Sequence, residues 1–463
     1  MKDLAYFSGL LGSAQLDQNS IASSRELLNR FVSFYSNASY TYDDKYVLSG
    51  SIRWDRSNLW GTNSKYQNKP LWSVGGSWNI YKEKFFQADF VDMLKLRASY
   101  GIGGNIGRNT APYLIASYYD TSLVDGMAGS VNTPPNKDIR WEKTTTVNVG
   151  VDFALFRHRL SGTIEYYNKY SVDLLAAING SPTQGFGYTT LMTNNGKMVN
   201  RGVEITLSGE IIRQKDFSWN ASLLYAFNRN KVKHISVQPS LWDSRISMPT
   251  SYPMVGKPLY GIYAYKWAGL NENGDPQVYD AENNVTSGPA RDYHALVYCG
   301  TTVPIHNASL TNVLRYKGFE FSAMLILDAG HKLRSSNIPS INMSNGRITS
   351  TAKGIVDRWT QPGDVTDVPR LLFSNDTENF NTHRTELYRY SDLFVYDASN
   401  IRLSNISLAY RVPAHWCKKI SLSGARLQFN VENVATFAFD SKANYDLGGK
   451  VKPNYVWGLY LNF

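Results

Sequence analysis

The last ten residues of the chain alternate strictly between two kinds of side chain. One kind is large and apolar and the other is small, polar or mixed; the two sets are Trp457, Leu459, Leu461, Phe463, and Val456, Gly458, Tyr460, Asn462. Successive side chains of a β-strand point to opposite faces, so the pattern predicts a strand with one fully apolar face. A strand that alternates lipid-facing and lumen-facing residues up to a terminal aromatic residue is what an outer-membrane β-barrel needs.

The same period of two recurs along the chain. It predicts paired strands near residues 31–42 with 46–56, 144–156 with 159–170, 199–212 with 217–229, and 306–316 with 319–329. The positions between the apolar residues often carry charge, as in the segment from Val203 to Ile211. Charges at regular inner positions are expected in a wet barrel lumen.

Short and long connections alternate between these strands. The short ones are 43–45, 157–158, 213–216 and 317–318, and the long ones are about 57–70, 103–143, 171–198, 230–305, 330–400 and 436–453. Transmembrane barrels have short periplasmic turns and long extracellular loops. We therefore predict an all-β fold, an antiparallel transmembrane barrel segment of about thirteen strands. If the turn at 43–45 is periplasmic, counting the strands from it brings the last strand down to the periplasmic end, where Phe463 would lie. The sequence pattern does not decide whether residues 230–305 and 330–400 contain short strands of their own.

Composition agrees with a barrel. The chain of 463 residues is 13% aromatic, yet its mean hydropathy is −0.34, a combination that a soluble Tyr-rich β-propeller or sandwich also allows. The sequence contains no run of 18 apolar residues, which excludes helical membrane spans. The net charge of +10 is dispersed, so it does not indicate nucleic acid binding.

Two connections at the periplasmic end are longer than a hairpin. Residues 81–93 predict a short amphipathic helix at the membrane edge, and residues 412–424 carry Trp416 beside Lys418 and Lys419. Both segments are interpreted as simple interfacial anchors.

Several motifs, in order, resemble those of SusC/RagA-type TonB-dependent transporters. They are Asp44-Lys45-Tyr46 with the run 51–57, the run 94–101 with Gly104-Asn105, the run 139–145, the run 200–204, the run 217–220, the strand 402–410 and Val431-Glu432-Asn433. The resemblance covers about residues 30–463. It implies an outer-membrane protein of a Gram-negative, Bacteroidetes-like bacterium.

The resemblance also implies parts that this sequence does not display. Members of the family have an N-terminal plug, a motif that contacts the TonB–ExbB–ExbD complex, and a barrel of about 22 strands. We expect residues 1–30 to be a partial extracellular loop and residues 31–463 the C-terminal portion of the barrel. No export signal is recognisable in the first 30 residues, so we expect either a fragment or one part of a split transporter.

No catalytic signature was found, and we predict neither an enzyme nor a cofactor. Gly101 to Gly107 is Gly-rich but follows a strand, and is interpreted as a strand-to-loop exit rather than a dinucleotide site. Residues 271–275 superficially resemble a calcium loop and are interpreted as a polar turn. Cys299 and Cys417 are expected at opposite ends of the barrel, so we do not predict a disulfide between them.

Any binding capacity is expected in loop aromatic residues, whose faces stack on sugar rings or peptide side chains. The candidates are Trp60, Tyr118, Tyr119 and Trp242, with Tyr66, Tyr252 and Tyr260 nearby; the alternative for each is loop packing. By resemblance, Tyr460, Leu461 and Phe463 form the C-terminal signal that the barrel-assembly machinery reads.

The predicted function is nutrient import. The resemblance implies a TonB-dependent importer of glycans, oligosaccharides or peptides, closed at its outer mouth by a SusD-like lipoprotein lid and embedded in outer-membrane lipid. The alternative is a passive porin or adhesin-like barrel, closed by this chain alone or by self-association.

Overall fold

A computed structural model describes residues 30–58, 63, 70–105, 107, 112–120, 127–180, 183, 190–239, 243–288, 290, 292–343, 351–373, 382–419, 421–448 and 452–463. Its main element is one antiparallel sheet of thirteen strands, which confirms the predicted fold and strand count. In sheet order the strands are β1 (Phe31–Tyr42), β2 (Tyr46–Ser57), β3 (Leu71–Asn79), β4 (Val91–Asn105), β7 (Glu142–Leu155), β8 (Leu160–Asn179), β9 (Thr190–Arg213), β10 (Phe217–His234), β16 (His306–Tyr316), β17 (Phe319–Ala329), β22 (Asn400–Arg411), β23 (Gly424–Ala438) and β24 (Asn454–Asn462).

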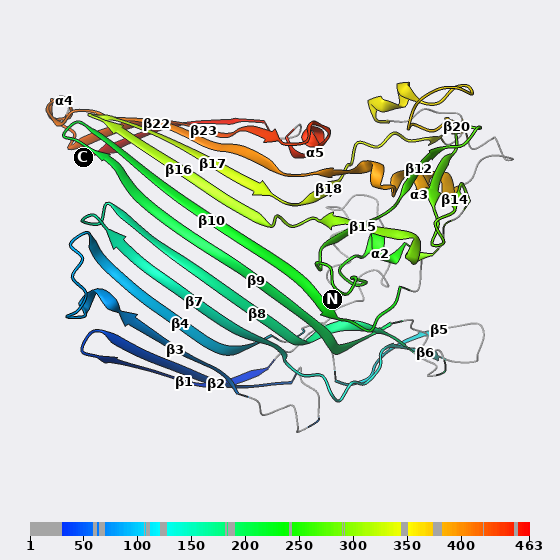
Figure 1. Ribbon diagram of the computed structural model, residues 1–463, viewed down its shortest axis with the longest axis horizontal. Coiled ribbons are helices and arrows are strands. Elements are labelled where there is room, and N and C mark those ends of the chain that lie inside the picture. Colours follow the sequence, from blue (N-terminus) through cyan, green and yellow to red (C-terminus); the bar gives the residue numbers. More distant parts are fainter. Residues whose placement is uncertain are drawn as a thin grey trace, which may run out of the picture.

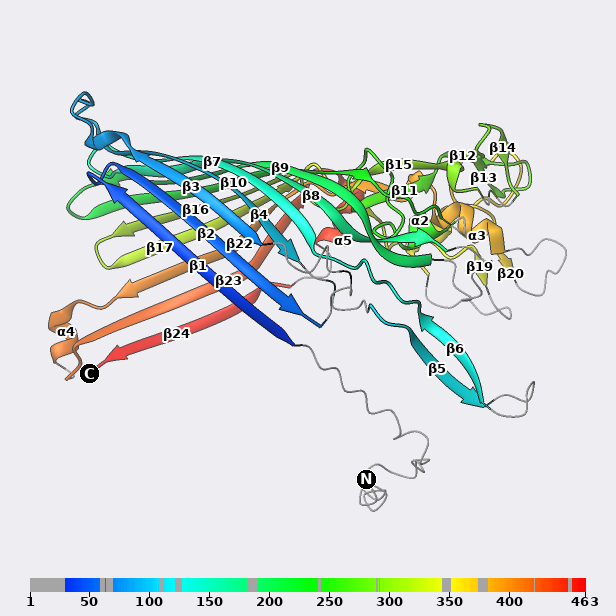
Figure 2. The same cartoon turned by 90° about the horizontal axis from the view of Figure 1, so that it is seen from below.

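The sheet is curved, with β1 and β24 at its two edges (Figures 1 and 2). The short turns lie at one end and the long connections at the other (Figure 1). The C-terminus lies at the end of the short turns, beside α4 (Ala414–Lys418), as the strand parity predicts.

The register separates the side chains into two faces. The outer face carries Leu96, Val151, Ile164, Ile205, Leu223, Leu310, Leu327 and Leu408, and the inner face carries Arg97, Asp152, Glu165, Glu204, Ser222, Ser309, Asp328 and Ser407. Outer-face side chains are broadly exposed: Trp457 by 78% and Phe34 by 74%. A continuous exposed apolar face opposite a polar one is the arrangement of a barrel wall in lipid.

Aromatic side chains of the outer face form two belts. The belt near the short turns contains Tyr42, Tyr46, Trp78, Trp219, Tyr316, Phe319 and Tyr410, and the other contains Phe34, Trp54, Trp72, Tyr100, Tyr166, Tyr225, Phe227 and Tyr455. Eight residues separate the belts on β1 and on β10, which is about 27 Å along a strand. A strand tilt of about 40° reduces this to roughly 20 Å, similar to the apolar band of known barrels at about 25 Å.

The connection from residue 80 to 90 differs from the prediction. Only Ile80–Lys82 forms a turn of 3-10 helix, and β4 begins at Val91, so the predicted amphipathic helix over 81–93 is wrong. Glu83 accepts hydrogen bonds from the Tyr46 hydroxyl and from Trp78 Nε1. These contacts hold the backbone of Glu83 in an extended conformation and end the turn.

At the other end, the strands β8 and β9 extend beyond the predicted bounds, and the long connections contain smaller sheets. These are β5 (Ile115–Asp120) with β6 (Met127–Thr133), β11 (Gly261–Tyr265) with β15 (Leu296–Thr301), β12 (Trp267–Leu270) with β13 (Pro276–Tyr279) and β14 (Val285–Thr286), β18 (Lys332–Arg334) with β21 (Val395–Asp397), and the parallel pair β19 (Asn342–Met343) with β20 (Leu372–Phe373). The other helices are α2 (Ser244–Ser247), α3 (Thr382–Arg389) and α5 (Asn444–Leu447), with 3-10 turns at Tyr293–Ala295, Lys353–Asp357, Asp392–Phe394 and Ser441–Ala443. Within the described residues, no helix has both the length and the apolarity needed to cross a bilayer.

Candidate functional site

Two long connections fold together at the end opposite the short turns. They follow β10 and β17, and we call the described parts of residues 235–305 and 330–399 the cap (Figure 1). Tyr265 of β11 forms a backbone bridge with Ser391, which joins the two connections. The cap has its own apolar core of Tyr263, Tyr265, Val278, Leu296 and Leu387, beside a second cluster of Ile341, Tyr388 and Phe394. Most of the largest fully buried side chains among the described residues therefore lie in the cap rather than in the sheet.

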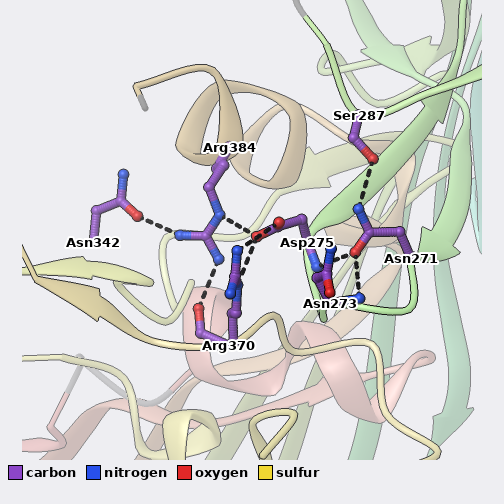
Figure 3. A network of polar contacts seen from close by, with 7 residues as sticks. All are labelled: Asn271, Asn273, Asp275, Ser287, Asn342, Arg370 and Arg384. Atoms are coloured by element: carbon purple, nitrogen blue, oxygen red, sulfur yellow. Dashed lines mark hydrogen bonds and ion pairs between the residues drawn. The ribbon is translucent and has the colours of Figure 1, made fainter. Parts of the chain in front are cut away.

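A buried ion-pair cluster centres on Asp275, just before β13. Arg370 donates from Nε and Nη2 to the two carboxylate oxygens at 3.0 and 2.8 Å, and Arg384 of α3 donates from Nε to Oδ1 at 2.6 Å. Figure 3 shows both guanidinium groups converging on this carboxylate. Arg384 is 1% exposed, and its remaining nitrogens donate to Asn342 Oδ1 and to the Arg370 carbonyl. The Asp275 carboxylate thus ties both halves of the cap together.

The turn that precedes Asp275 is the segment with a superficial resemblance to a calcium loop. Asn271 Oδ1 accepts hydrogen bonds from the backbone N–H groups of Asn273 and Asp275 (Figure 3). With two guanidiniums on the Asp275 carboxylate, the segment is a polar turn, which confirms the interpretation from sequence. Within the described residues, no group of three His, Cys, Asp or Glu side chains could hold a metal ion.

Arg334 of β18 is a second link between the halves of the cap. Its guanidinium donates to the carbonyl oxygens of Tyr263 at 2.7 Å, Arg389 at 3.1 Å and Ser391 at 3.2 Å. Burial lowers the pKa of Arg334 from its ordinary value. Three carbonyl acceptors compensate the loss of hydration, so the side chain acts as a crosslink.

A third connection, between β23 and β24, also reaches the cap. Asp446 of α5 accepts hydrogen bonds from the Ser335 and Ser336 hydroxyls at 2.8 and 2.6 Å. The cap is thereby anchored to the connection between β23 and β24 through charge-assisted hydrogen bonds.

Two cavities adjoin the cap. One, of about 320 Å³, lies between the upper ends of β8, β9 and β10 and residues 250–259, and its lining is mainly aliphatic, with Leu174, Met192, Met198 and Leu259. The other, of about 510 Å³, is lined by Arg334, Ser335, Ser336, Thr385, Arg389 and Tyr390 among others. The first suits an apolar group and the second a polar one.

On the inner face of the sheet, a polar network spans β4, β7 and β8. Arg97 donates to both carboxylate oxygens of Asp152 at 3.2 Å and to Glu165, which also accepts from Asn148. Thr163 donates to Asp152 at 3.1 Å. Each charged group has a partner, so the network fixes the side chains that line this part of the inner face.

The binding residues predicted from sequence do not come together. Trp60 and Trp242, like Tyr66, lie outside the described residues. Tyr118 is 71% exposed on the β5–β6 hairpin, which extends away from the cap (Figures 1 and 2), and the backbone of Tyr119 pairs with Ala128. Their role in binding stays a prediction.

For the nearby aromatic residues, the sequence allows two alternatives, ligand binding and loop packing. Tyr252 is 7% exposed and is part of the packing, whereas Tyr260 is 51% exposed. What the sequence did not reveal is the Asp275 cluster, because its arginines lie 95 and 109 residues away and follow no motif.

The structure also places the two cysteines and the Gly-rich run. Cys299 lies in β15 of the cap and Cys417 in α4 at the opposite end, and both are free thiols, as predicted. The Gly-rich run is not a loop exit throughout, because β4 continues to Asn105. A Cβ atom at Gly101 would lie 2.7 Å from Ser73 Cβ, so the adjacent strand requires glycine there.

The C-terminal residues take the predicted positions. Leu461 and Phe463 lie on the outer side, 42% and 92% exposed, while Tyr460 pairs with Arg426 on the inner face. Their use as an assembly signal stays a prediction.

Comparison with known proteins connects this architecture to one family. A family model described as "TonB dependent receptor-like, beta-barrel" matches residues 5–434. TonB-dependent receptor P3 of Formosa agariphila is 26% identical over 97% of this chain and 45% of its own length. TonB-dependent receptor SusC of Bacteroides thetaiotaomicron is 25% identical over 88% of this chain and 40% of its own.

A solved structure has the same fold. The structure entitled "Structure of the RagAB peptide transporter" matches with a TM-score of 0.75 at 23% identity, over 94% of this chain and 48% of that one. The chain spans about half the length of the relatives that it matches. The resemblance found in the sequence motifs is confirmed by these matches, and the outer membrane is the location that the family implies. The chain belongs to the TonB dependent receptor-like, β-barrel family.

Proposed function

We propose that this chain supplies barrel wall and surface loops to a TonB-dependent nutrient importer in the outer membrane of a Gram-negative, Bacteroidetes-like cell. The observation that carries the proposal is a sheet with an exposed apolar outer face and a charged inner face, topped by a folded cap. The relatives named TonB-dependent receptor support import rather than catalysis.

The two edges of the sheet require further strands. Among the described residues, β1 pairs only with β2, and β24 only with β23. Unpaired backbone groups in hydrocarbon cost several kcal/mol each, so an open sheet is not viable in a bilayer. We propose that strands outside this sheet close a barrel of about 22 strands around a plug, and that residues 31–463 are the C-terminal portion of that barrel.

The partners follow from the same proposal. A SusD-like lipoprotein is expected to close over the cap, and TonB–ExbB–ExbD is expected to deliver energy through the plug. The cap supports a lid partner because its core and its Asp275 cluster give a folded surface instead of flexible loops. Cargo is an oligosaccharide or a peptide, and the aliphatic and the polar cavity offer contacts to either.

The experiment uses the intact receptor, tagged in its own outer membrane. It should copurify with a surface lipoprotein, and cells should take up labelled oligosaccharides or peptides only when TonB is present. Uptake that persists without TonB would instead support the passive porin, and a receptor that copurifies with no lipoprotein would remove the proposed lid.

A further inference from the structure

Four basic residues gather at the upper ends of β9 and β10. Arg201 of β9 lies directly opposite Arg229 of β10, and Lys231 follows two residues later on the same face. Lys257 joins them, because the Val232 N–H donates to the Lys257 carbonyl at 2.9 Å. Lys257 Nζ lies 4.9 Å from the centre of the Tyr298 ring. We call Arg201, Arg229, Lys231 and Lys257 the basic cluster.

Within the part of the chain that the structure describes, the cluster is not matched by acidic ion-pair partners. Among the described residues, none of its members forms an ion pair, and Arg201, Arg229 and Lys231 are all exposed. Arg201 Nε donates to Asn168 Oδ1 at 3.1 Å, which orients the guanidinium while leaving its terminal nitrogens for another acceptor. Like charges directly opposite each other on neighbouring strands are destabilising, so an anion bound between Arg201 and Arg229 would stabilise the pair.

Most of the positive charge at this height lies on the outer face, and Lys169 of β8 is an inner-face cation opposite Asn200. At the same height, the inner face carries Asn200, Asn228 and Asn230, and Asn230 donates to Asn200 Oδ1 at 2.6 Å. Cations that attract an anionic cargo into the lumen would have to lie on this inner face. The basic cluster therefore faces the membrane, not the transport path.

The height of the cluster matches the membrane surface. Arg229 lies twelve residues above Phe217, which is about 40 Å along the strand and roughly 31 Å along the membrane normal at a tilt of about 40°. Phe227, Tyr225 and Tyr166 of the upper aromatic belt lie just below it on the same face. Cations directly above an interfacial aromatic belt meet lipid headgroups rather than acyl chains.

We propose that Arg201 and Arg229, flanked by Lys231, bind a phosphate group of a lipid headgroup in the outer leaflet. Guanidinium groups form paired hydrogen bonds with phosphate oxygens, and two of them side by side can hold one doubly charged phosphate from both sides. Lys257 adds charge at the rim of the cap. The inference depends on the outer-membrane location that the family implies, and it is independent of cargo, lid and TonB.

The test compares lipid retention by the intact receptor and by variants. Receptors extracted from outer membranes are incorporated into nanodiscs of neutral lipid doped with diphosphoryl lipid A, monophosphoryl lipid A or phosphatidylglycerol, and the bound lipid is counted by native mass spectrometry. The charge-removing variant is Arg201→Gln with Arg229→Gln. The matched control is Lys169→Gln, because Lys169 lies on the inner face of β8 opposite Asn200.

The expected result is retention in the order diphosphoryl, monophosphoryl, then phosphatidylglycerol, with an approximately tenfold loss in the double variant and none in the control. An Arg201→Lys, Arg229→Lys variant should bind less than the wild type, because lysine lacks the paired hydrogen bonds, but more than the double Gln variant, because it keeps the charge. Equal retention by the wild type and the folded double variant would overturn the proposal. Displacement of the lipid by millimolar inorganic phosphate would also overturn it, because the site would then recognise free phosphate.

Discussion

Asp275 and Arg384 are 109 residues apart in the chain, yet Arg384 Nε lies 2.6 Å from Asp275 Oδ1 inside the cap. Arg384 is almost completely buried, and the Asp275 side chain is 17% exposed. This contact and the one from Arg370 join two loops that begin after different strands. The cap is therefore one folded unit whose stability depends on a few long-range ion pairs.

Arg384→Met should loosen the cap without unfolding the sheet. Removing one partner of a buried ion pair costs about 3–5 kcal/mol, because the other charge is left with fewer partners. Hydrogen exchange should rise in residues 261–279 and 382–397 and stay unchanged in β7–β9. Arg358→Met is the matched control, since Arg358 is an exposed arginine of the same loop. Equal protection in both variants would show that the ion pair is not what holds the cap.

Cys299 should react slowly with alkylating reagents. Burial raises the pKa of the Cys299 thiol to about 11, whereas an ordinary thiol has a pKa of about 8.5. Because the thiolate is the nucleophile, at pH 8 the folded protein should react about a hundredfold more slowly at Cys299 than the denatured protein. The rate should rise about tenfold per pH unit up to pH 10.

Peptide mass mapping after iodoacetamide treatment separates Cys299 from Cys417. A Cys299 rate that is the same in folded and denatured protein would refute the raised pKa of this half-buried thiol.

Arg97→Met should destabilise the barrel wall itself. Arg97 is the donor shared by Asp152 and Glu165, and its loss leaves two carboxylates side by side on the inner face. The expected cost is about 1–3 kcal/mol, measured as a lower denaturant midpoint for the intact receptor. Lys169→Met serves as the control, because Lys169 has no ion pair among the described residues. Equal midpoints for the two variants would contradict a structural role for the network.

An arginine introduced on the outer face of β10 should destabilise the protein more than one introduced on its inner face. Leu223 lies on the outer face midway between Trp219 and Phe227, and Ser222 next to it lies on the inner face. Leu223→Arg should cost about 2–4 kcal/mol of folding free energy, since it places a cation at the centre of the bilayer. Ser222→Arg should cost much less. Refolding titrations of both variants into lipid give the comparison, and equal costs would count against a lipid-facing side.

Much of the sheet can be predicted from sequence because the alternation of apolar and polar residues along each strand distinguishes its two faces. The alternation from Val203 to Ile211 and that of the last ten residues are local patterns, and the short turns between them fix antiparallel pairing. The thirteen strands and the position of Phe463 were therefore predictable. The segment at 81–93 was not, because Glu83 is held by Tyr46 from another hairpin.

The cap could not be predicted for the same reason. Asp275, Arg334 and Arg384 look like ordinary loop residues until the fold brings distant segments together. Aromatic residues are easier to single out in a sequence, yet Tyr118 proves to be isolated on an exposed hairpin. Binding at the upper end stays a prediction from loop composition, and the three-dimensional contacts show which of the described loop residues lie together.

The most direct test of the account is a lipid-quenching scan of β10 in the intact, reconstituted receptor. Single cysteines at positions 222 to 227, in a background with Cys299→Ser and Cys417→Ser, would carry a fluorophore in bilayers with nitroxide-labelled acyl chains. The account predicts strong quenching at Leu223→Cys, Tyr225→Cys and Phe227→Cys, and weak quenching at Ser222→Cys, Leu224→Cys and Ala226→Cys. Quenching without this alternation would contradict a strand that separates lipid from lumen.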